Sequence, residues 1–386
     1  MLEHLAFLGM QKTRGNYPMK SILLTTTALV AFAGAAVAEV SFSGEAALGY
    51  NDDGAQGNDG FYWDGNLVVN LTQELDNGVT AGVEFDIDFS DTSLGEDLAS
   101  GGYVLSLTSE NAGLFFGDVA FAAETHWVGT GWMQSDNFSE ADGETALRGD
   151  VSFGGFDASV SYVITNNDGD PTVANDVDQL SLGMRGDFGN FNVSAAYQAA
   201  SDEAEDFYND PLLGSDNGDF NQNEVFGVSV GTTFAGATVR LAYADDSETD
   251  SLGISASYPV GPVTLSGAYV LEDGDDNSWR VRAVYSDGPI TLTANYEERV
   301  GSYRYNIEGG YDLGNGLSVF AGYLDREAWT DGEAFYVAGE YDLGSGAKLL
   351  VSYADADGLP QGFLNDDEVG AREYQIGTTV EVSFQF

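Results

Sequence analysis

Residues 373–386 are EYQIGTTVEVSFQF, and this stretch decides the fold. Apolar and polar side chains alternate along it, which is the pattern of a β-strand with one apolar and one polar face. One face carries Tyr374, Ile376, Val380, Val382, Phe384 and Phe386, and the other carries Glu373, Gln375, Glu381, Ser383 and Gln385. Chain ends normally fray into water, so a terminal aromatic residue on the apolar face indicates an anchored end.

The segment Val40–Tyr50 repeats the same alternation, with Phe42 and Leu48 on its apolar face and Glu45 on its polar face. We expect the two segments to pair with each other and close a barrel.

The composition indicates an all-β chain rich in glycine and aromatic residues. The 386 residues include 50 Gly, 23 Phe and 20 Tyr but only 7 Pro, which fits two all-β domains or one large barrel. Cysteine is absent, which excludes disulfides and thiolate metal sites.

The charge balance is strongly acidic, with 13 Lys and Arg against 63 Asp and Glu. Such a chain is not expected to bind nucleic acid, because phosphates need Lys and Arg. The 12% of aromatic residues argue against disorder.

The first 38 residues have the form of a secretory leader. Met19 and Lys20 precede the apolar run Ile22–Ala33, and Ala36-Val37-Ala38 has the small-x-small form of a cleavage site. The run is too short to span a bilayer as a helix. We therefore expect residues 1–18 to be a non-structural upstream extension, residues 19–38 a signal peptide and residues 39–386 the mature barrel.

The next two segments predict a hairpin with an acidic face. Phe61–Leu75 and Val79–Ser90 alternate in the same way and flank Asp76-Asn77-Gly78, an Asn-Gly turn of the kind that joins two strands. The polar face of this hairpin carries Asp64, Glu74, Glu84, Asp86 and Asp88.

Short turns of this kind recur nine times and alternate with long acidic loops, which is the connection pattern of outer-membrane barrels. The turns lie at 76–78, 110–112, 154–155, 189–190, 235–236, 260–262, 286–288, 314–316 and 344–346. Nine hairpins and the two end strands predict twenty strands.

Aromatic residues mark both ends of these strands on the apolar face. Six residues span about 20 Å of strand, or roughly 15 Å along the membrane normal when tilted. With the aromatic residues beside the turns, the band approaches the roughly 25 Å between aromatic girdles. Stacked sandwiches with ordinary core aromatics are the alternative. The residues are Phe153, Phe188, Phe234, Tyr258, Tyr285, Tyr311 and Tyr341 before the turns, and Tyr162, Tyr197, Tyr243, Tyr269, Tyr296, Tyr323 and Tyr353 after them.

Residues 19–386 resemble a general diffusion porin of the Gram-negative outer membrane, of the alphaproteobacterial type. The shared motifs are the start Glu39-Val40-Ser41-Phe42-Ser43-Gly44, Phe116-Gly117-Asp118 before a long third loop, Tyr311-Asp312-Leu313-Gly314 at a hairpin end, and the terminal Phe386. The resemblance implies an all-β transmembrane antiparallel barrel of 16 strands, against 20 by turn count, with a pore-constricting third loop. It also implies a homotrimer in the outer membrane, in contact with lipopolysaccharide and recognised through its terminal strand by the assembly machinery.

The segment 120–143 is the candidate constriction loop, with a plain exposed loop as the alternative. Its acids are Glu124, Asp136, Glu140 and Asp142. The arginines of the strands fall on the polar face, which we expect to point into the barrel. On a lipid-facing wall each arginine would cost a few kcal/mol near the midplane. We predict Arg148, Arg240, Arg280, Arg282 and Arg304 as one wall of the constriction, with Arg185 on the same face, and Glu45, Asp64, Glu74, Glu84, Asp86 and Asp88 as lumen acids.

The sequence gives little support for catalysis or for a bound cofactor. After the leader the only histidine is His126, so a catalytic triad or a histidine-rich zinc site is hard to assemble, and we expect no enzyme. We expect no cofactor, although hard oxygen ligands in the acidic loops make calcium a candidate without assigned ligands.

Two functions of different classes remain. The first is a passive, cation-preferring channel, because the first positive residue of the mature chain is Arg148. The second is a non-conducting surface barrel or adhesin that binds a partner through its acidic loops.

Overall fold

The computed structural model describes residues 38–52, 60–91, 96–139, 145–165, 176–201, 223–327, 332–356 and 374–386. The upstream extension predicted for residues 1–18, and the predicted signal peptide up to residue 37, lie outside the described residues.

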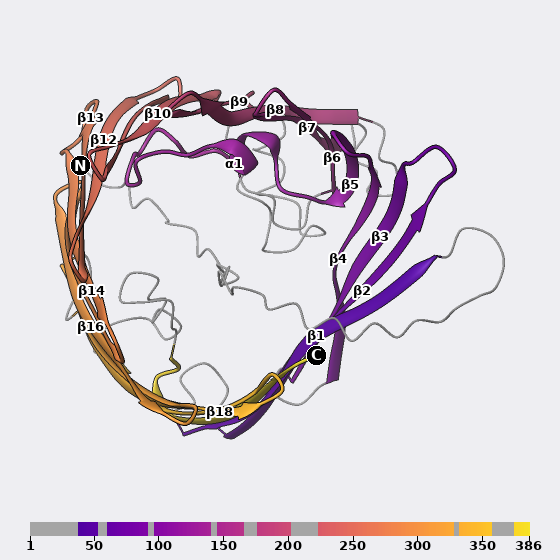
Figure 1. Cartoon of the computed structure of the whole chain (residues 1–386). Helices are drawn as coiled ribbons and strands as arrows, with labels where there is room; N and C mark the ends of the chain where they lie inside the picture. The colour runs from indigo at the N-terminus through magenta and orange to yellow at the C-terminus, as the bar shows by residue number, and fades with distance from the viewer. Residues whose placement is uncertain are drawn as a thin grey trace, which may run out of the picture.

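The described residues form twenty antiparallel strands, each paired with the next along the chain, and the last strand pairs with the first. Figure 1 looks into the resulting ring, around which the colour runs in chain order. The strands are β1 Glu39–Asn51, β2 Gly60–Glu74, β3 Thr80–Asp91, β4 Glu96–Thr108, β5 Ala112–Asp118, β6 Thr145–Phe153, β7 Phe156–Thr165, β8 Asp176–Phe188, β9 Phe191–Gln198, β10 Val225–Phe234, β11 Ala237–Asp245, β12 Asp250–Val260, β13 Val263–Glu272, β14 Ser278–Asp287, β15 Ile290–Arg299, β16 Ser302–Gly314, β17 Leu317–Arg326, β18 Glu333–Gly344, β19 Ala347–Ala356 and β20 Gly377–Gln385.

The predicted closure between the two end strands is confirmed. Pairing of β1 with β20 runs from Glu45 opposite Gln385 to Tyr50 opposite Val380. The amide of Phe386 also donates to the carbonyl of Gly44 at 2.9 Å. The ladder therefore leaves neither end strand as an open edge.

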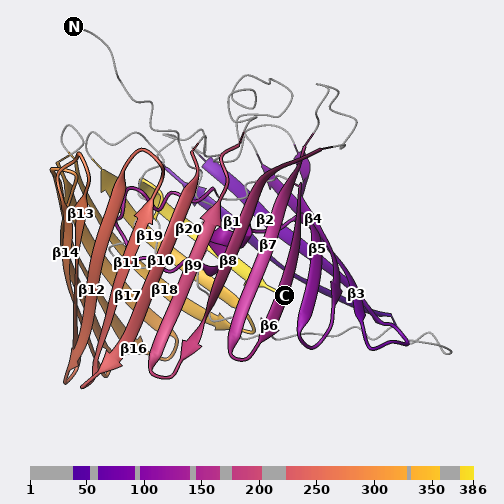
Figure 2. The ribbon, with the colours of Figure 1, turned by 90° about the horizontal axis from the view of Figure 1, so that it is seen from above.

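Short turns follow every second strand, as the sequence predicted, and Figure 2 shows them together at one end of the tilted strands. At the other end the strands β15 and β16 are an exception to the predicted long loops, because only Val300 and Gly301 join them. Gly78, in the Asn-Gly turn, has a φ of 78°, which a side chain would disfavour. The turn count of twenty is confirmed, and the sixteen strands implied by the family resemblance are exceeded.

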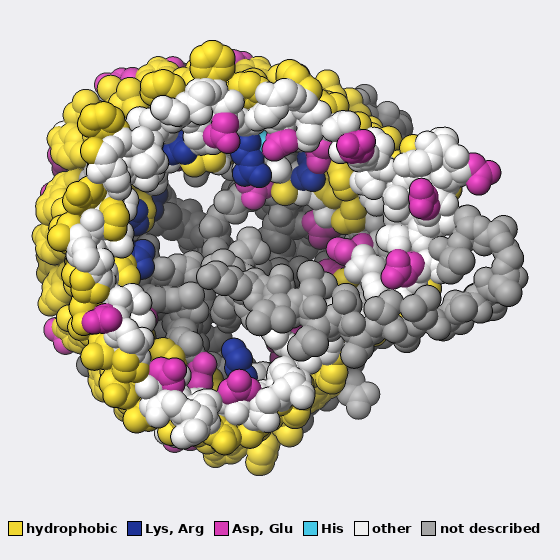
Figure 3. Space-filling view, in the orientation of Figure 1, with side chains coloured by type: hydrophobic (Ala, Val, Ile, Leu, Met, Phe, Trp, Pro, Cys, Tyr) yellow, Lys and Arg dark blue, Asp and Glu magenta, His cyan; other side chains and the backbone are white. Residues whose placement is uncertain are grey.

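The outer surface of the ring is apolar. Figure 3 shows hydrophobic side chains over most of it and Lys and Arg side chains on the inner wall. The predicted end aromatics lie outside, with Phe153 65% exposed beside a short turn and Tyr353 45% exposed at the other end of its strand. These side chains form the two predicted girdles.

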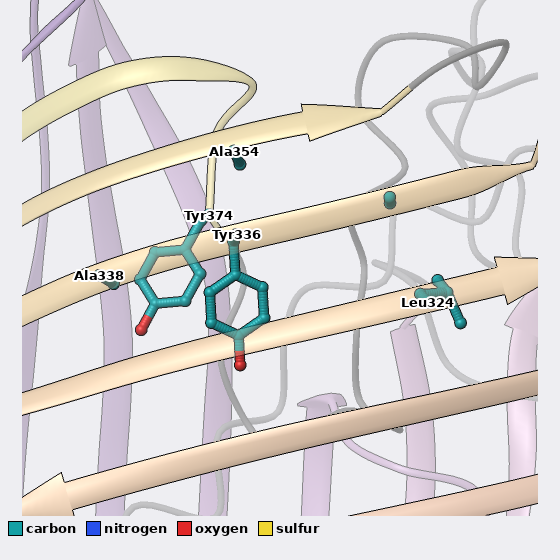
Figure 4. Packing of buried hydrophobic residues seen from close by; sticks show 6 residues of the cluster. Leu324, Tyr336, Ala338, Ala354 and Tyr374 are labelled. Carbon is teal, nitrogen blue, oxygen red and sulfur yellow. The ribbon is translucent and has the colours of Figure 1, made fainter.

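One part of the terminal alternation is wrong. The last strand begins at Gly377, so Tyr374 precedes it and does not continue its apolar face. Gly377 has a φ of 89°, which redirects the chain, and Tyr374 is only 5% exposed. Its ring lies 4.6 Å from that of Tyr336 on the inner face of β18, and Figure 4 shows the two rings side by side.

The described residues contain one short helix, α1 Ala122–His126. No helix in the described part of the chain is long and apolar enough to cross a membrane.

Candidate functional site

The segment after β5 folds into the barrel. Gly117, the next-to-last residue of β5, has a φ of 128°, and a Cβ there would lie 2.0 Å from the carbonyl oxygen of Tyr103, so only glycine fits. Phe121 and Val119 then pack with Ala146 and Val163 on β6 and β7. Figure 1 shows the segment and α1 running along the inside of the wall past β7, β8 and β9. We call residues 119–139 the inner loop.

Serine hydroxyls on the inner faces of the strands hold the backbone of the inner loop. Ser161 on β7 accepts from the amide of Ala122 at 2.9 Å, and Ser181 on β8 accepts from that of Ala123 at 2.8 Å. These two bonds satisfy amides at the start of α1 that have no partner within the helix.

Serine hydroxyls also hold the backbone of the inner loop beyond α1. Ser194 on β9 accepts from the amide of Val128 at 3.1 Å and donates to the carbonyl of His126 at 2.8 Å. Ser251 on β12 accepts from the amide of Ser135 at 3.1 Å. Four strands therefore hold successive parts of the inner loop with one kind of side chain.

Glycines on the same inner faces let the inner loop approach the wall closely. A Cβ at Gly183 on β8 would lie 2.0 Å from the carbonyl oxygen of Ala122, and one at Gly227 on β10 would lie 2.6 Å from the ring of Trp127. A Cβ at Gly253 on β12 would lie 1.9 Å from the hydroxyl oxygen of Thr130. These distances are far below van der Waals contact, so the three positions require glycine while the inner loop is in place.

Arg240 and Arg280 of the predicted constriction both contact the inner loop. Arg240 on β11 donates to the carbonyl of Val128 at 3.3 Å and to the hydroxyl of Ser229 at 2.7 Å. The guanidinium of Arg280 on β14 lies 3.7 Å from the ring centroid of Trp132, a cation–π contact. The structure thus brings both arginines to the inner loop.

Arg148 contacts the start of the inner loop from β6. It donates to the carbonyl of Ala120 at 2.8 Å, pairs with Asp150 at 3.0 Å and lies over the ring of Phe115.

The other predicted arginines lie on β8, β14 and β16. Arg304 on β16 lies 4.0 Å from a carboxylate oxygen of Glu297. Arg282 lies on β14 and is partly exposed, whereas Arg185 near the end of β8 is exposed.

Two of the four predicted acids of the constriction lie in the described part of the inner loop. Glu124 lies in α1 and is partly exposed, and Asp136 accepts a hydrogen bond from the indole of Trp127 at 3.0 Å. Burial raises the pKa of Asp136, which the hydrogen bond from Trp127 opposes. Glu140 and Asp142 lie outside the described residues.

The predicted lumen acids lie on β1, β2 and β3 at the inward parity. Glu45, Asp64, Glu74 and Glu84 are exposed, and Asp86 and Asp88 are partly buried. Asp88 accepts a hydrogen bond from Asn66 at 2.9 Å. Figure 1 places β3 on the side of the ring opposite β14. In the described part of the chain no three acidic or histidine side chains come close enough together to hold a metal ion.

The serine and glycine positions that hold the inner loop were missed by the sequence reasoning. Their signal is visible afterwards as small residues at the inward parity of consecutive strands. Small inward residues are also what a water-filled lumen would show, and the sequence does not say what lies against them. The positions are Ser161, Ser181, Gly183, Ser194, Gly227, Ser251 and Gly253.

His126 lies at the end of α1 and is 4% exposed. Its Nε2 lies 2.6 Å from the hydroxyl of Ser159 on β7. Burial lowers the pKa of His126, and the positive charge of Arg185 lowers it further.

Comparison with known proteins identifies a family that this sequence matches. The model of the family described as Gram-negative porin matches residues 25–213 and 205–361. A search of curated proteins found no match.

Among solved structures, a triple mutant of the Rh. blastica porin is 15% identical with a TM-score of 0.45. A second triple mutant of the Rhodopseudomonas blastica porin is 17% identical with a TM-score of 0.39. Each alignment covers 90% of this chain and 100% of the other. Because the family match spans most of the sequence, the chain belongs to the Gram-negative porin family and is an outer-membrane channel.

Proposed function

We propose that this porin carries ions and small hydrophilic solutes by passive diffusion and prefers cations. The observation that supports this preference is the one-sided charge of β1 to β5. Residues 39–118 contain no Lys or Arg, and the inner faces of β1 to β3 present Glu45, Asp64, Glu84 and Asp88. A cation that passes this wall meets carboxylates without neighbouring basic side chains from the same strands.

The expected preference is moderate. Salt screens each charge within about 8 Å at physiological ionic strength, so only acids near a narrow part of the lumen act strongly on an ion. Several such acids favour a monovalent cation by on the order of 1 kcal/mol, which is close to tenfold in partition. The preference is expected to weaken as salt rises.

The inner loop is proposed as one wall of the constriction. It lies along β7 to β12 and is held there by hydrogen bonds, so it narrows the lumen from one side. Glu124, Asp136, Glu140 and Asp142 are its proposed acids. Arg148, Arg240, Arg280, Arg282 and Arg304 are the proposed basic groups of the wall around it.

Reversal potentials of the purified protein across a KCl gradient test the preference. The wild type is expected to favour potassium, and the combined change Glu84→Gln, Asp86→Asn and Asp88→Asn is expected to reduce the selectivity. Glu248→Gln, on the exposed turn between β11 and β12, is the control and is expected to change nothing. Anion preference in the wild type would contradict the proposal, and absence of conductance would favour a barrel that binds a partner through its loops.

A matching variant tests the inner loop. Replacing Glu124, Asp136, Glu140 and Asp142 by the corresponding amides is expected to shift the reversal potential toward zero. An unchanged potential would remove these acids from the constriction. No catalytic role is proposed for any of these residues.

We further propose a homotrimer that contacts lipopolysaccharide, with calcium bound by the acidic loops, on the basis of the family resemblance and the loop composition. The size in detergent without boiling is expected to be about three times that of the heated chain. A single monomeric species would contradict the trimer.

A further inference from the structure

The tip of the inner loop holds one aromatic side chain in a backbone conformation that bulky residues avoid. Gly131 and Trp132 have φ angles of 76° and 64°, both in the left-handed region. For a bulky residue a positive φ is an outlier, and such strain persists only where the surrounding contacts impose it. The packing on either side of Trp132 therefore holds its side chain in place.

These contacts clamp the tip at two points. Thr130 is 6% exposed and lies against Gly253 on β12, where a Cβ would overlap its hydroxyl oxygen. Met133 is 4% exposed and belongs to a buried cluster with Val270 on β13. Trp132 lies between the two clamped residues and is partly exposed.

The guanidinium of Arg280 on β14 fixes the plane of the indole. It lies over the ring of Trp132, 3.7 Å from the ring centroid, which is the geometry of a cation–π contact. One face of the ring is thus directed at Arg280 on the wall, and the opposite face points away from this guanidinium.

A row of polar side chains crosses the inner wall beside this ring. Arg282 on β14 pairs in register with Asn295 on β15, and Asn295 pairs with Asn306 on β16. Arg282 lies two residues from Arg280 on the same strand, and therefore on the same face and about 7 Å farther along. The row is close enough to Trp132 for one small solute to contact both. We call Arg282, Asn295 and Asn306 the polar row.

The two amides of the polar row are buried and incompletely hydrogen-bonded. Asn306 is 2% exposed, and neither its Oδ1 nor its Nδ2 has a hydrogen-bond partner among the described residues. Asn295 is 6% exposed and donates from Nδ2 to Glu297 at 3.2 Å, whereas its Oδ1 has no partner in the same part of the chain. Burying a polar group without a hydrogen bond is costly, so these amides favour a ligand that supplies both donors and acceptors.

We propose that Trp132 and the polar row form a binding site in the lumen for a polyhydroxylated ring, that is, a pyranose sugar. The C–H bonds on one side of such a ring form a flat apolar face, which packs on the face of an aromatic side chain. Amides and hydroxyl groups each both donate and accept hydrogen bonds, so Asn295 and Asn306 complement the sugar hydroxyls, and Arg282 adds donors. Glu297, which the register places beside Arg280, adds an acceptor and disfavours an anion. This site rests on the proposed diffusion of hydrophilic solutes and adds a preference among them.

The test is single-channel current in KCl with D-glucose added on both sides, compared with sorbitol at equal concentration. Sorbitol is an open-chain polyol of similar size, so it controls for viscosity and for exclusion of ions by volume. The wild type is expected to lose more current in glucose than in sorbitol, and the difference is expected to saturate as the sugar concentration rises.

Two variants remove the two halves of the site. Trp132→Leu keeps an apolar side chain without a flat face, and Asn306→Leu replaces a buried amide by an apolar group of similar size. Each is expected to raise the half-effective glucose concentration by about threefold to tenfold. Trp132→Phe keeps an aromatic face and is expected to retain most of the glucose effect. Trp63→Leu is the matched control, because this indole lies on β2 and contacts the ring of Phe89, and the glucose effect is expected to be unchanged.

Saturation-transfer NMR of glucose with the detergent-solubilised protein measures binding without conductance. Transfer to the glucose protons is expected with the wild type and with Trp63→Leu, and much less transfer with Trp132→Leu and Asn306→Leu. Equal current loss in glucose and sorbitol together with no saturation transfer would overturn the site, as would unchanged glucose effects in both variants.

Failure of the proposed function gives a different result. Anion preference across a KCl gradient, or absence of conductance, would contradict the proposed cation channel. Saturation transfer then decides the sugar site by itself: transfer that is lost in Trp132→Leu supports the site, and no transfer with the wild type overturns it.

Discussion

The contact between Gly183 and α1 makes a sharp test of how the inner loop is held. The change Gly183→Ala adds a Cβ at 2.0 Å from the carbonyl oxygen of Ala122 and 2.9 Å from the Cβ of His126. Both neighbours belong to α1, and the first is backbone, so the overlap cannot be relieved by a side-chain rotation. We expect α1 to leave the wall.

The magnitude follows from the bonds that α1 then loses. These are the bonds of Ala122 to Ser161 at 2.9 Å, of Ala123 to Ser181 at 2.8 Å, and of His126 to Ser159 at 2.6 Å. At about 1 kcal/mol net for each bond, the three bonds favour the seated state by about 3 kcal/mol, or roughly 100-fold. The overlap at Gly183→Ala has to exceed this free energy for α1 to leave the wall.

Single-channel recording and limited chymotrypsin digestion check this prediction. The variant is expected to show altered conductance with more open-channel noise, and faster cleavage at Trp127 and Trp132. Gly339→Ala on β18 is the matched control, because a Cβ there has no atom within 4 Å. A Gly183→Ala protein with wild-type conductance, noise and cleavage would refute the close packing described for α1.

Two further outcomes follow from the structure. Deleting Phe386 removes the backbone bond to Gly44 at 2.9 Å and the last aromatic of the outer face, so folding into a heat-modifiable barrel should be impaired, and normal assembly of the truncated chain would count against this role of the terminus. The lowered pKa of His126 means that the unfolded chain takes up this proton first, at its ordinary pKa of about 6.5. Stability in detergent should therefore be fully present above that pH and fall as the pH drops below it, and a His126→Gln protein whose thermal unfolding keeps the same pH dependence would exclude His126 as the cause.

The sequence by itself determined the strands, their faces and their turns. These features are local, because a strand alternates with a period of two and a turn needs residues such as Asn77 and Gly78 at adjacent positions. The end strands could also be matched to each other, since an anchored apolar terminus needs a partner. Even the count of twenty strands came from turn residues, whereas the family resemblance implied fewer.

Only the tertiary structure decided which side chains contact each other inside the barrel. Ser251 and Ser135 lie more than 100 residues apart in sequence, and their contact depends on the accumulated register of all the strands between them. The row of Arg282, Asn295 and Asn306 likewise exists only because two strand registers align these residues. The alternation along each strand predicted that such side chains point inward. The tilt and stagger of the closed sheet decide which inward residues become neighbours, and no local sequence pattern encodes this tilt and stagger.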